Sequence, residues 1–298
     1  MGQVLATVNM KGGVGKTTLT VNLATCLARD RQQRVLVIDL DSQISATLSL
    51  IAPQDFARLR RGRRTLSYLI DKVIRPYIPR KYETADMIVS SVCGVSGLDL
   101  LPGDIELYDE YVVSEALYKK ASEGVDTKFG EVWDSFENLL VETVIASVRD
   151  RYDFILIDCA PGYNLLTRSA LVASQYYLLP ARPEPLSLVG IQLLQRRVEK
   201  LRAKVEPALN LDLLGIVFIL SNSGGLFPSR YYNQIIERVE QDFTPDFIFQ
   251  NRIPMDVNVA KAVDAFAPAV VNAPNSAGSR AFVKLAEEFV QKIAARSR

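Results

Sequence analysis

The chain of 298 residues carries 35 basic and 34 acidic side chains, so its formal net charge at pH 7 is +1. A nearly neutral protein binds nucleic acid only through a local basic patch, because its overall field attracts no polyanion. Histidine is absent, which excludes histidine-activated nucleophiles and most zinc chemistry. The three cysteines have the spacing of neither a disulfide framework nor a zinc site (Cys26, Cys93 and Cys159).

Short apolar runs alternate with helical patterns along the chain. The predicted strands lie at 3–9, 34–41, 98–103, 152–162, 176–181 and 213–222. A helical pattern at 18–30 follows the first strand, and helical stretches separate most of the others. Such alternation predicts an α/β fold, a twisted and mostly parallel sheet flanked by helices, whose ligands bind beyond the carboxyl ends of the strands. We expect one domain over 1–298, elaborated at about 52–130 by a helical region on one side of the sheet.

The stretch KGGVGKTT at 11–18 lies between the first predicted strand and the first predicted helix, which is the setting of a phosphate-binding loop. Its end fits the ordinary P-loop pattern. Met10, however, occupies the position of the first glycine, and an additional lysine, Lys11, stands beside it. A glycine-rich turn with a chance lysine is the alternative interpretation.

Each residue type in this loop has a chemical reason to be there. Gly12, Gly13 and Gly15 allow backbone N–H groups to turn inward around phosphate oxygens, at the positive end of the following helix. Lys16 is expected to reach the β- and γ-phosphates, and the Thr17 hydroxyl to ligate Mg²⁺. The loop therefore predicts a site for a nucleoside triphosphate with magnesium.

Acidic residues end two other predicted strands. Asp158 closes the apolar run FILID, which is the Walker B arrangement for holding Mg²⁺ or its water shell. Asp39 and Asp41 lie two residues apart, so on a continuing strand their side chains would share one face. One of these two carboxylates can brace the metal while the other orients the attacking water.

These motifs together resemble those of the ParA/MinD family, whose ATPases carry a deviant Walker A motif. KGGVGKTT, with its lysine before the paired glycines, is similar to that motif, VLVIDLDSQ resembles the second motif, and FILIDCAPG resembles the Walker B segment. LLPARPEPLSLVGIQLL and NRIPMDVNVAKAVDAF are similar to later ParA segments. The resemblance covers about 1–50 and 150–298, while the region 52–130 is longer than the corresponding region of the family and less similar to it.

The resemblance implies an ATPase with ATP and Mg²⁺ as cofactors and a nucleotide-sandwich dimer. In that dimer Lys11 would reach the phosphates held by the other subunit, Asp41 would position the water, and Thr18 would contact the α-phosphate. Asn222 and the 253–256 turn would lie around adenine. The residues assigned to the nucleotide are Lys11, Gly12, Gly13, Val14, Gly15, Lys16, Thr17, Thr18, Asn222, Ile253, Pro254, Met255 and Asp256, and those assigned to the metal are Thr17, Asp39 and Asp158.

Other branches of the family fit the sequence less well. Iron–sulfur branches need cysteines at the dimer axis, but Cys159 directly follows Asp158 and no CxxC is present. The tyrosine-kinase branch ends in a tyrosine cluster, which this chain lacks. A MinD-like membrane-cycling ATPase remains the alternative, because Phe282, Leu285, Phe289 and Ile293 share one face of the last predicted helix. We expect that face to pack on the sheet.

Two predicted helices carry basic clusters, and ParA proteins bind nucleoid DNA nonspecifically through such patches as ATP dimers. The candidate DNA-binding residues are Arg196, Arg197, Lys200, Arg280 and Lys284. Ordinary solvated helix faces are the alternative interpretation. The arginine-rich stretch at 58–64 could touch DNA, dock a partner or only solvate a loop.

The resemblance implies a partition or positioning ATPase. Its cargo would be a plasmid, a chromosome or a protein organelle such as a carboxysome, and a cargo-bound adaptor protein (ParB-like or McdB-like) would stimulate hydrolysis. The first residues show no basic leader, and no apolar run approaches the ~20 residues that a spanning helix needs. We therefore expect a cytoplasmic, nucleoid-associated protein.

Overall fold

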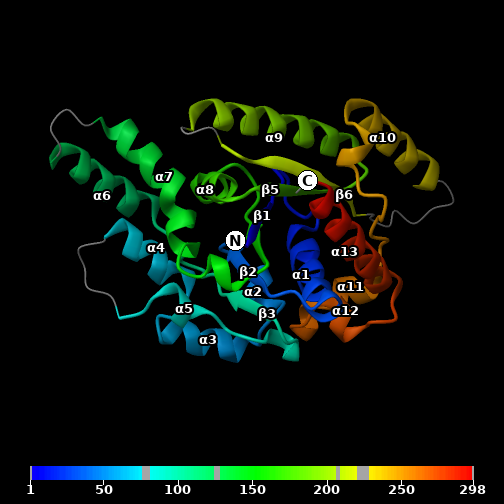
Figure 1. Ribbon diagram of the computed structural model, residues 1–298, viewed down its shortest axis with the longest axis horizontal. Helices are drawn as coiled ribbons and strands as arrows, with labels where there is room; N and C mark the ends of the chain where they lie inside the picture. Colours follow the sequence, from blue (N-terminus) through cyan, green and yellow to red (C-terminus); the bar gives the residue numbers. More distant parts are fainter. Residues whose placement is uncertain (1, 76–80, 124–127, 206–208, 220–227, 297–298) are drawn as a thin grey trace.

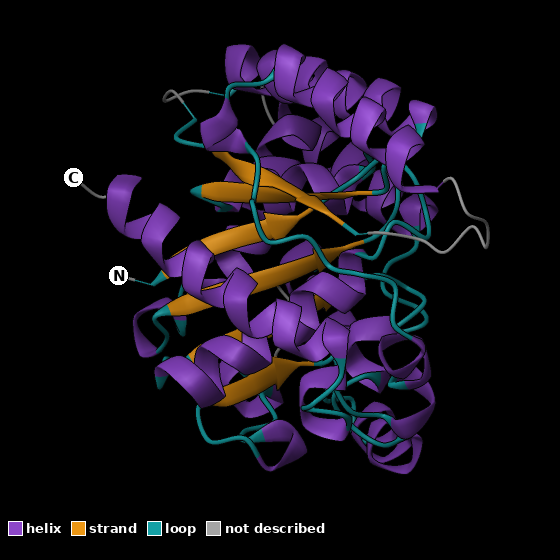
Figure 2. Ribbon diagram, turned by 90° about the vertical axis from the view of Figure 1, so that its right-hand side faces the viewer, coloured by secondary structure: helices purple, strands orange, loops and turns teal. Residues whose placement is uncertain are grey.

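The computed structural model describes residues 2–75, 81–123, 128–205, 209–219 and 228–296. Within these residues, a six-stranded parallel sheet forms the centre of the molecule, with helices on both faces (Figures 1 and 2). The strands are β1 (Gln3–Thr7), β2 (Val35–Leu40), β3 (Leu98–Leu101), β4 (Phe154–Cys159), β5 (Tyr176–Ala181) and β6 (Asp212–Phe218), in the order β3-β2-β4-β1-β5-β6. The predicted strands and the α/β class are confirmed, with different bounds for most strands.

Helices cover both faces because successive strand residues point to opposite sides and both sides are apolar. Val4 and Ala6 of β1 belong to one core, and Leu5 between them belongs to the other. The first core lies under α4 (Leu66–Ile74), α6 (Glu110–Glu123), α7 (Phe129–Ile145), α8 (Leu165–Ala173), α9 (Pro185–Lys204) and α10 (Pro228–Asp242). The second lies under α1 (Lys16–Arg31), α2 (Ser45–Leu48), α3 (Pro53–Arg61), α12 (Ala269–Asn272) and α13 (Ala277–Arg296).

The remaining elements are short. They are the helices α5 (Thr84–Met87) and α11 (Val257–Lys261) and the 3₁₀ turns η1 (Val92–Gly94), η2 (Arg149–Arg151), η3 (Pro245–Phe247) and η4 (Val263–Ala265). Of these, α5 contributes Met87 to the first core and η1 contributes Val92 to the second.

The helical region at 52–130 wraps around the β3 edge and does not stay on one side as predicted. Phe56 of α3 packs in the second core, whereas Leu69 of α4 and Val113 of α6 pack in the first. Val89 also exchanges two backbone hydrogen bonds with Leu100 of β3, with N–O distances of 2.8 and 2.9 Å. An edge strand needs such cover, because its unpaired backbone groups would otherwise pair with another chain.

Helix α13 packs on the sheet through the face that the sequence pattern identified. Phe282, Leu285, Phe289 and Ile293 are buried in the second core, and the Phe289 ring centre lies 5.4 Å from that of Phe154 on β4. The apolar face of this helix is therefore used within the fold. In the described part of the chain, every helix is too short or too polar to cross a membrane.

Candidate nucleotide site

The phosphate loop between β1 and α1 is held in place by Asn9 and by two left-handed glycines. The Asn9 amide donates to the carbonyl oxygen of Pro180 at 2.8 Å, and its Oδ1 accepts from the Lys11 backbone N–H at 2.9 Å. Gly13 and Gly15 have φ of 70° and 88°. A Cβ on Gly15 would lie 2.6 Å from Cδ1 of Ile219, so a larger residue at this position would displace that side chain.

The start of α1 forms an electropositive end to the loop. The helix begins at Lys16 and has no acidic residue in its first turn, so its free N–H groups and dipole favour an anion. Lys16 is buried, and its Nζ donates to the Lys11 carbonyl oxygen at 3.2 Å. Burial lowers the pKa of Lys16, while Asp158 and Asp41 oppose that shift. The loop therefore presents a partly desolvated ammonium that an anionic ligand would stabilise.

Two buried carboxylates lie side by side below the loop. Asp39 and Asp158 are opposite each other in the β2–β4 register, and both are fully buried. Asp158 accepts from the Thr17 hydroxyl at 2.6 Å and from the Thr20 hydroxyl at 3.2 Å. Burial raises the pKa of both carboxyls, and the nearby Asp39 raises that of Asp158 further. Such a pair favours a cation, because a cation relieves both the desolvation and the mutual repulsion.

Asp39 and Asp41 point to different surroundings, although we predicted that a continuing strand would place them on one face. Strand β2 ends at Leu40, so Asp41 lies in the following turn. Both oxygens of Asp39 accept hydrogen bonds: Oδ2 from the backbone and hydroxyl of Thr47 at 2.8 and 2.7 Å, and Oδ1 from the Asp41 N–H at 3.1 Å. Asp41 instead lines the cleft above the loop.

That cleft, about 660 Å³ in volume, lies between the loop and the segment after β6. The 253–256 turn lines it as expected, but Asp256 is also a structural residue: its two oxygens accept from the N–H groups of Asn258 and Gly278, each at 2.8 Å. Asn222 lies outside the described residues. The cleft is also lined by apolar residues that the sequence analysis did not assign to the nucleotide, among them Val259, Val263 and Ala269.

The Lys11 side chain is paired with an acid of its own chain. Its Nζ lies 2.7 Å from Oε2 of Glu184, the residue that precedes α9. Both side chains are partly exposed, Lys11 by 40% and Glu184 by 30%. The sequence analysis missed Glu184, and also Arg182, which lines the cleft. Both follow the carboxyl end of β5, so the rule that placed the other site residues would have indicated them.

Comparisons with known proteins identify relatives that cover nearly the whole chain. The family model described as an AAA domain matches residues 2–211. The chromosome partitioning protein ParA of Caulobacter vibrioides is 29% identical over 293 residues, which cover 97% of this chain and 94% of its own. The sporulation initiation inhibitor protein Soj of Bacillus subtilis is 30% identical over 291 residues, which cover 97% and 98%. The solved septum site-determining protein MinD of Pyrococcus horikoshii, complexed with Mg-ADP, aligns with a TM-score of 0.64 and 25% identity over 100% of this chain and 99% of its own.

The chain belongs to the ParA/MinD family. It is a P-loop ATPase, and the lysine that distinguishes the ParA/MinD loop from the ordinary pattern is Lys11. In this ParA/MinD fold the lysine is paired within its own chain.

The two basic clusters of this ParA/MinD chain lie on opposite faces of the sheet. Helix α9 packs on the first core and α13 on the second, so the clusters do not form one patch in a single chain (Figure 1). Arg196, Arg197 and Lys200 on α9 are exposed, and none of them pairs with a carboxylate of the described residues. Further along α9 the charges are neutralised, since Arg202 and Lys204 form ion pairs with acids at 2.9 and 2.6 Å.

Proposed function

We propose that this ParA/MinD ATPase is a ParA-type positioning protein that forms an ATP-dependent homodimer on nonspecific nucleoid DNA in the cytoplasm. It positions or segregates a cargo, which is a plasmid, a chromosome or a protein organelle such as a carboxysome. An adaptor protein on the cargo stimulates ATP hydrolysis and releases the dimer from DNA. A single ATPase domain over 1–298 carries these activities.

ATP and Mg²⁺ are the cofactors of this function. In the described residues there is no group of three acidic, cysteine or histidine side chains that would hold a metal alone. This suits Mg²⁺, which binds through one or two protein ligands, water and substrate phosphates. We assign Mg²⁺ to Thr17 and Asp158, whose oxygens lie 2.6 Å apart. Asp39 lies opposite Asp158 in the β2–β4 register, and both of its oxygens already accept hydrogen bonds from Thr47 and Asp41, so we assign Asp39 to the surroundings of the metal and not to direct ligation. Asp41, on the cleft wall, orients the attacking water.

The Lys11–Glu184 ion pair is the main observation in support of the dimer and of DNA binding by α9. Lys11 must leave Glu184 to reach phosphates in a second subunit, where a cation stabilises charge on the transferred group. Glu184 stands at the start of α9, the helix that carries Arg196, Arg197 and Lys200. Release of Lys11 therefore removes an ion pair at the start of α9, the helix that we propose binds the phosphates of DNA.

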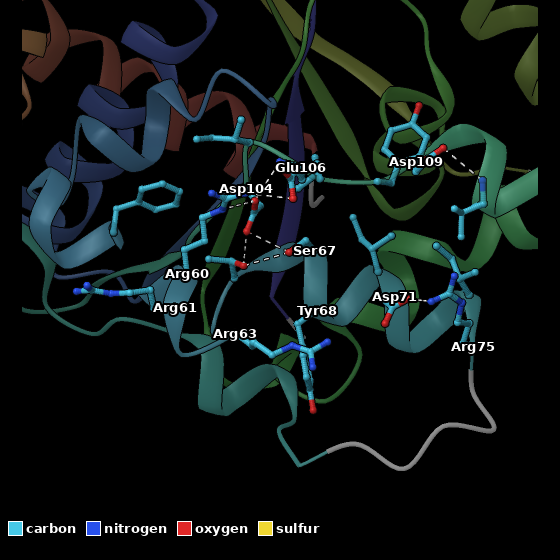
Figure 3. Close-up of a pocket in the computed structure, with 18 of the residues that line it drawn as sticks. Arg60, Arg61, Arg63, Ser67, Tyr68, Asp71, Arg75, Asp104, Glu106 and Asp109 are labelled. Carbon is cyan, nitrogen blue, oxygen red and sulfur yellow. Dashed lines mark hydrogen bonds and ion pairs between the residues drawn. The ribbon is translucent and has the colours of Figure 1, made fainter. Parts of the chain in front are cut away.

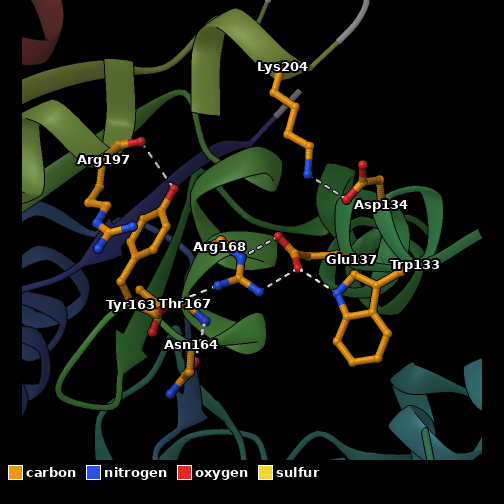
Figure 4. Close-up of polar contacts among 9 residues, drawn as sticks. All are labelled: Trp133, Asp134, Glu137, Tyr163, Asn164, Thr167, Arg168, Arg197 and Lys204. Atoms are coloured by element: carbon orange, nitrogen blue, oxygen red, sulfur yellow. Dashed lines mark hydrogen bonds and ion pairs between the residues drawn. The ribbon is translucent and has the colours of Figure 1, made fainter. Parts of the chain in front are cut away.

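A second contact joins α9 to the nucleotide site (Figure 4). Tyr163, four residues after Cys159, donates its hydroxyl to the Arg197 carbonyl oxygen at 3.2 Å, and the Arg197 guanidinium lies 5.9 Å from the Tyr163 ring centre. Arg168 also holds this tyrosine: its guanidinium donates to the Tyr163 carbonyl oxygen at 3.0 Å and forms an ion pair with Glu137. The middle of α9 is thus fixed to the loop that follows the Walker B strand.

DNA binding to α9 is tested by charge reversal that leaves these contacts intact. Arg196→Glu with Lys200→Glu changes one exposed face and spares Arg197. With a nonhydrolysable ATP analogue, the double variant should bind unrelated duplexes at least tenfold more weakly, with a shallower salt slope, because a protein that neutralises Z phosphates shows a log–log slope near −0.9Z. Basal ATPase should be unchanged.

The matched control is Arg280→Glu with Lys284→Glu on α13, which has the same change in charge on the other face. Equal losses in both variants would extend the DNA surface to α13, and a loss only in the control would move it there. Binding that is the same with ADP and with the ATP analogue would contradict the proposal. Pelleting of the parent protein with anionic vesicles, but not with DNA, would replace it with a membrane-cycling function.

A further inference from the structure

The arginine-rich stretch that the sequence left unassigned forms the rim of a groove. This groove is a hollow of about 850 Å³ between α3, α4 and the segment from Asp104 into α6 (Figure 3). Its floor is apolar, formed by Phe56, Ile70, Ile74, Leu107 and Val112. We call it the arginine groove. It shares no lining residue with the nucleotide cleft in the described part of the chain.

Most charges in the arginine groove are already paired, and the pairs fix its shape. Arg60 forms ion pairs with Asp104 and Glu106, each at 3.2 Å. Asp104 is almost fully buried and also accepts hydrogen bonds from the hydroxyls of Thr65 at 2.6 Å and Ser67 at 3.1 Å. These contacts join the end of α3 to the start of α4 through Asp104 and define the wall of the groove.

Two arginines on the rim remain without acidic partners. Arg61 and Arg63 are exposed and line the groove, and no carboxylate of the described residues forms an ion pair with either. The Arg63 guanidinium lies 5.6 Å from the ring centre of Tyr68, which orients it along the rim. Of the four arginines and four acids that line the groove, Arg61, Arg63 and Asp109 form no ion pair within the described residues, so the unpaired charge sums to +1, and the two arginines place it on the rim above an apolar floor.

This combination favours an acidic peptide segment over nucleic acid. A duplex presents phosphates on a convex surface and would leave the apolar floor uncovered, whereas a peptide can place an apolar side chain in the hollow and carboxylates against the arginines. Arginine is also the side chain best suited to bind carboxylates at interfaces, through its fork of N–H donors.

The groove is connected to the nucleotide site by a short chain of contacts. Gly103, next to Asp104, donates its N–H to the Thr47 hydroxyl at 3.0 Å, and that hydroxyl donates to Asp39 at 2.7 Å. A Cβ on Gly103 would lie 2.8 Å from the Asp39 carbonyl oxygen, so the two backbones are in direct contact. A segment bound in the groove would press on the same element that supports the buried carboxylates.

We propose that the arginine groove docks an acidic segment of a partner protein, with an apolar side chain on its floor and carboxylates against Arg61 and Arg63, and that docking is coupled to the nucleotide site through Gly103, Thr47 and Asp39. The partner rests on the proposed function, in which an adaptor controls hydrolysis. The binding surface itself does not depend on DNA or dimer formation.

The probe is a random library of 12-residue peptides displayed on phage, selected on the full-length parent protein. Enriched sequences should combine Asp or Glu with Phe, Leu or Trp. The most enriched peptide is then synthesised with a fluorescent label, and its binding is measured by anisotropy. Arg61→Glu and Arg63→Glu should each weaken binding about five- to tenfold, as expected for loss and repulsion of a rim charge.

Two further variants separate the groove from general surface charge. Arg58→Glu is the matched control, because Arg58 is an exposed arginine on the same helix that does not line the groove; it should change the affinity less than twofold. Ala57→Trp keeps every charge but fills the hollow, because Ala57 is an exposed lining residue, and it should weaken binding at least tenfold. Coupling predicts that the peptide affinity changes at least fivefold between nucleotide-free and ATP-analogue-bound protein.

Enrichment of basic peptides, equal loss in Arg58→Glu, or full binding by Ala57→Trp would overturn the docking surface. Competition by duplex DNA that is lost in Arg61→Glu would reassign the rim to nucleic acid. Equal peptide affinity in both nucleotide states would overturn the coupling. ATPase activity and DNA binding of the parent protein are measured separately, so a failure of the proposed function is recognised without reference to the peptide.

Discussion

The nucleotide cleft and the arginine groove use charge in opposite ways. At the nucleotide site, Lys16, Asp39 and Asp158 are buried, and their pKa values are shifted by loss of water. In the groove, Arg61 and Arg63 remain in water. A buried charge costs desolvation free energy, and its substitution has a large effect on stability or binding. An exposed charge contributes little to either until a partner covers it. Substitutions in the two regions should therefore differ mainly in the size of their effects.

Lys16→Ala should give the largest effect. Loss of a desolvated ammonium beside the phosphates should reduce ATP hydrolysis by about 10³-fold or more, mostly through lost binding. Phosphate release measures the loss of hydrolysis, and calorimetric titration with ATP measures the loss of binding. Arg61→Ala should leave both within twofold, and a Lys16→Ala variant with the parent's rate would contradict the role of the loop.

Asp41→Ala should bind ATP with nearly the parent's affinity and hydrolyse it about 10²-fold more slowly, since a residue that orients water acts after binding. ATP-bound dimers should then accumulate, and size-exclusion chromatography with multi-angle scattering detects them. Asp109→Ala, which removes an acid from the groove wall, should not accumulate dimers. Monomer alone from Asp41→Ala with ATP would show that its role is in binding.

Asp158→Asn should stabilise the metal-free, nucleotide-free protein at pH 8 by about 2 kcal/mol while abolishing hydrolysis. The folded-state pKa of Asp158 is raised above the unfolded value. Between the unfolded pKa, near 4, and the folded pKa, the folded state therefore holds more protons, and stability falls as pH rises. Urea denaturation at pH 5 and pH 8 should show this slope in the parent and a smaller slope in Asp158→Asn. A steeper slope in Asp158→Asn than in the parent would contradict the assignment.

Glu184→Gln should have the smallest effect. The Lys11–Glu184 pair is partly exposed, so its loss corresponds to at most about 1 kcal/mol. Freeing Lys11 should lower the dimer dissociation constant with ATP up to about fivefold, as measured by analytical ultracentrifugation. The same substitution at Glu106 in the groove should leave dimerisation unchanged. Weaker dimers from Glu184→Gln would mean that Glu184 contacts the second subunit.

The sequence predicted the strands and the phosphate loop because both depend on neighbouring residues. Gly15 and Lys16 have fixed positions relative to β1 and α1 whatever surrounds them, and the alternation of Val4, Leu5 and Ala6 between two cores follows from strand geometry alone.

What the sequence did not predict depends on how distant elements pack. Glu184 reaches Lys11 only because β5 lies next to β1, and no local motif records that pairing. The sequence showed basic clusters on two predicted helices, but the separation of these helices onto two faces of the sheet follows from the strand order. The role of Arg61 depends in the same way on α4 and α6, which form the groove beside it.

The strand order also has a consequence for how the chain is made. β1 lies between β4 and β5, and Thr7 pairs with Asp158, about 150 residues later. At about 5–20 residues per second, the ribosome needs roughly 8–30 s to supply that partner. β2 and β3 can pair much earlier, so β1 and its loop remain unpaired next to an incomplete sheet. During this interval the nascent protein exposes the very strand that later carries its nucleotide site. Chaperone binding during synthesis should therefore concentrate on the first residues and end once β4 and β5 have emerged.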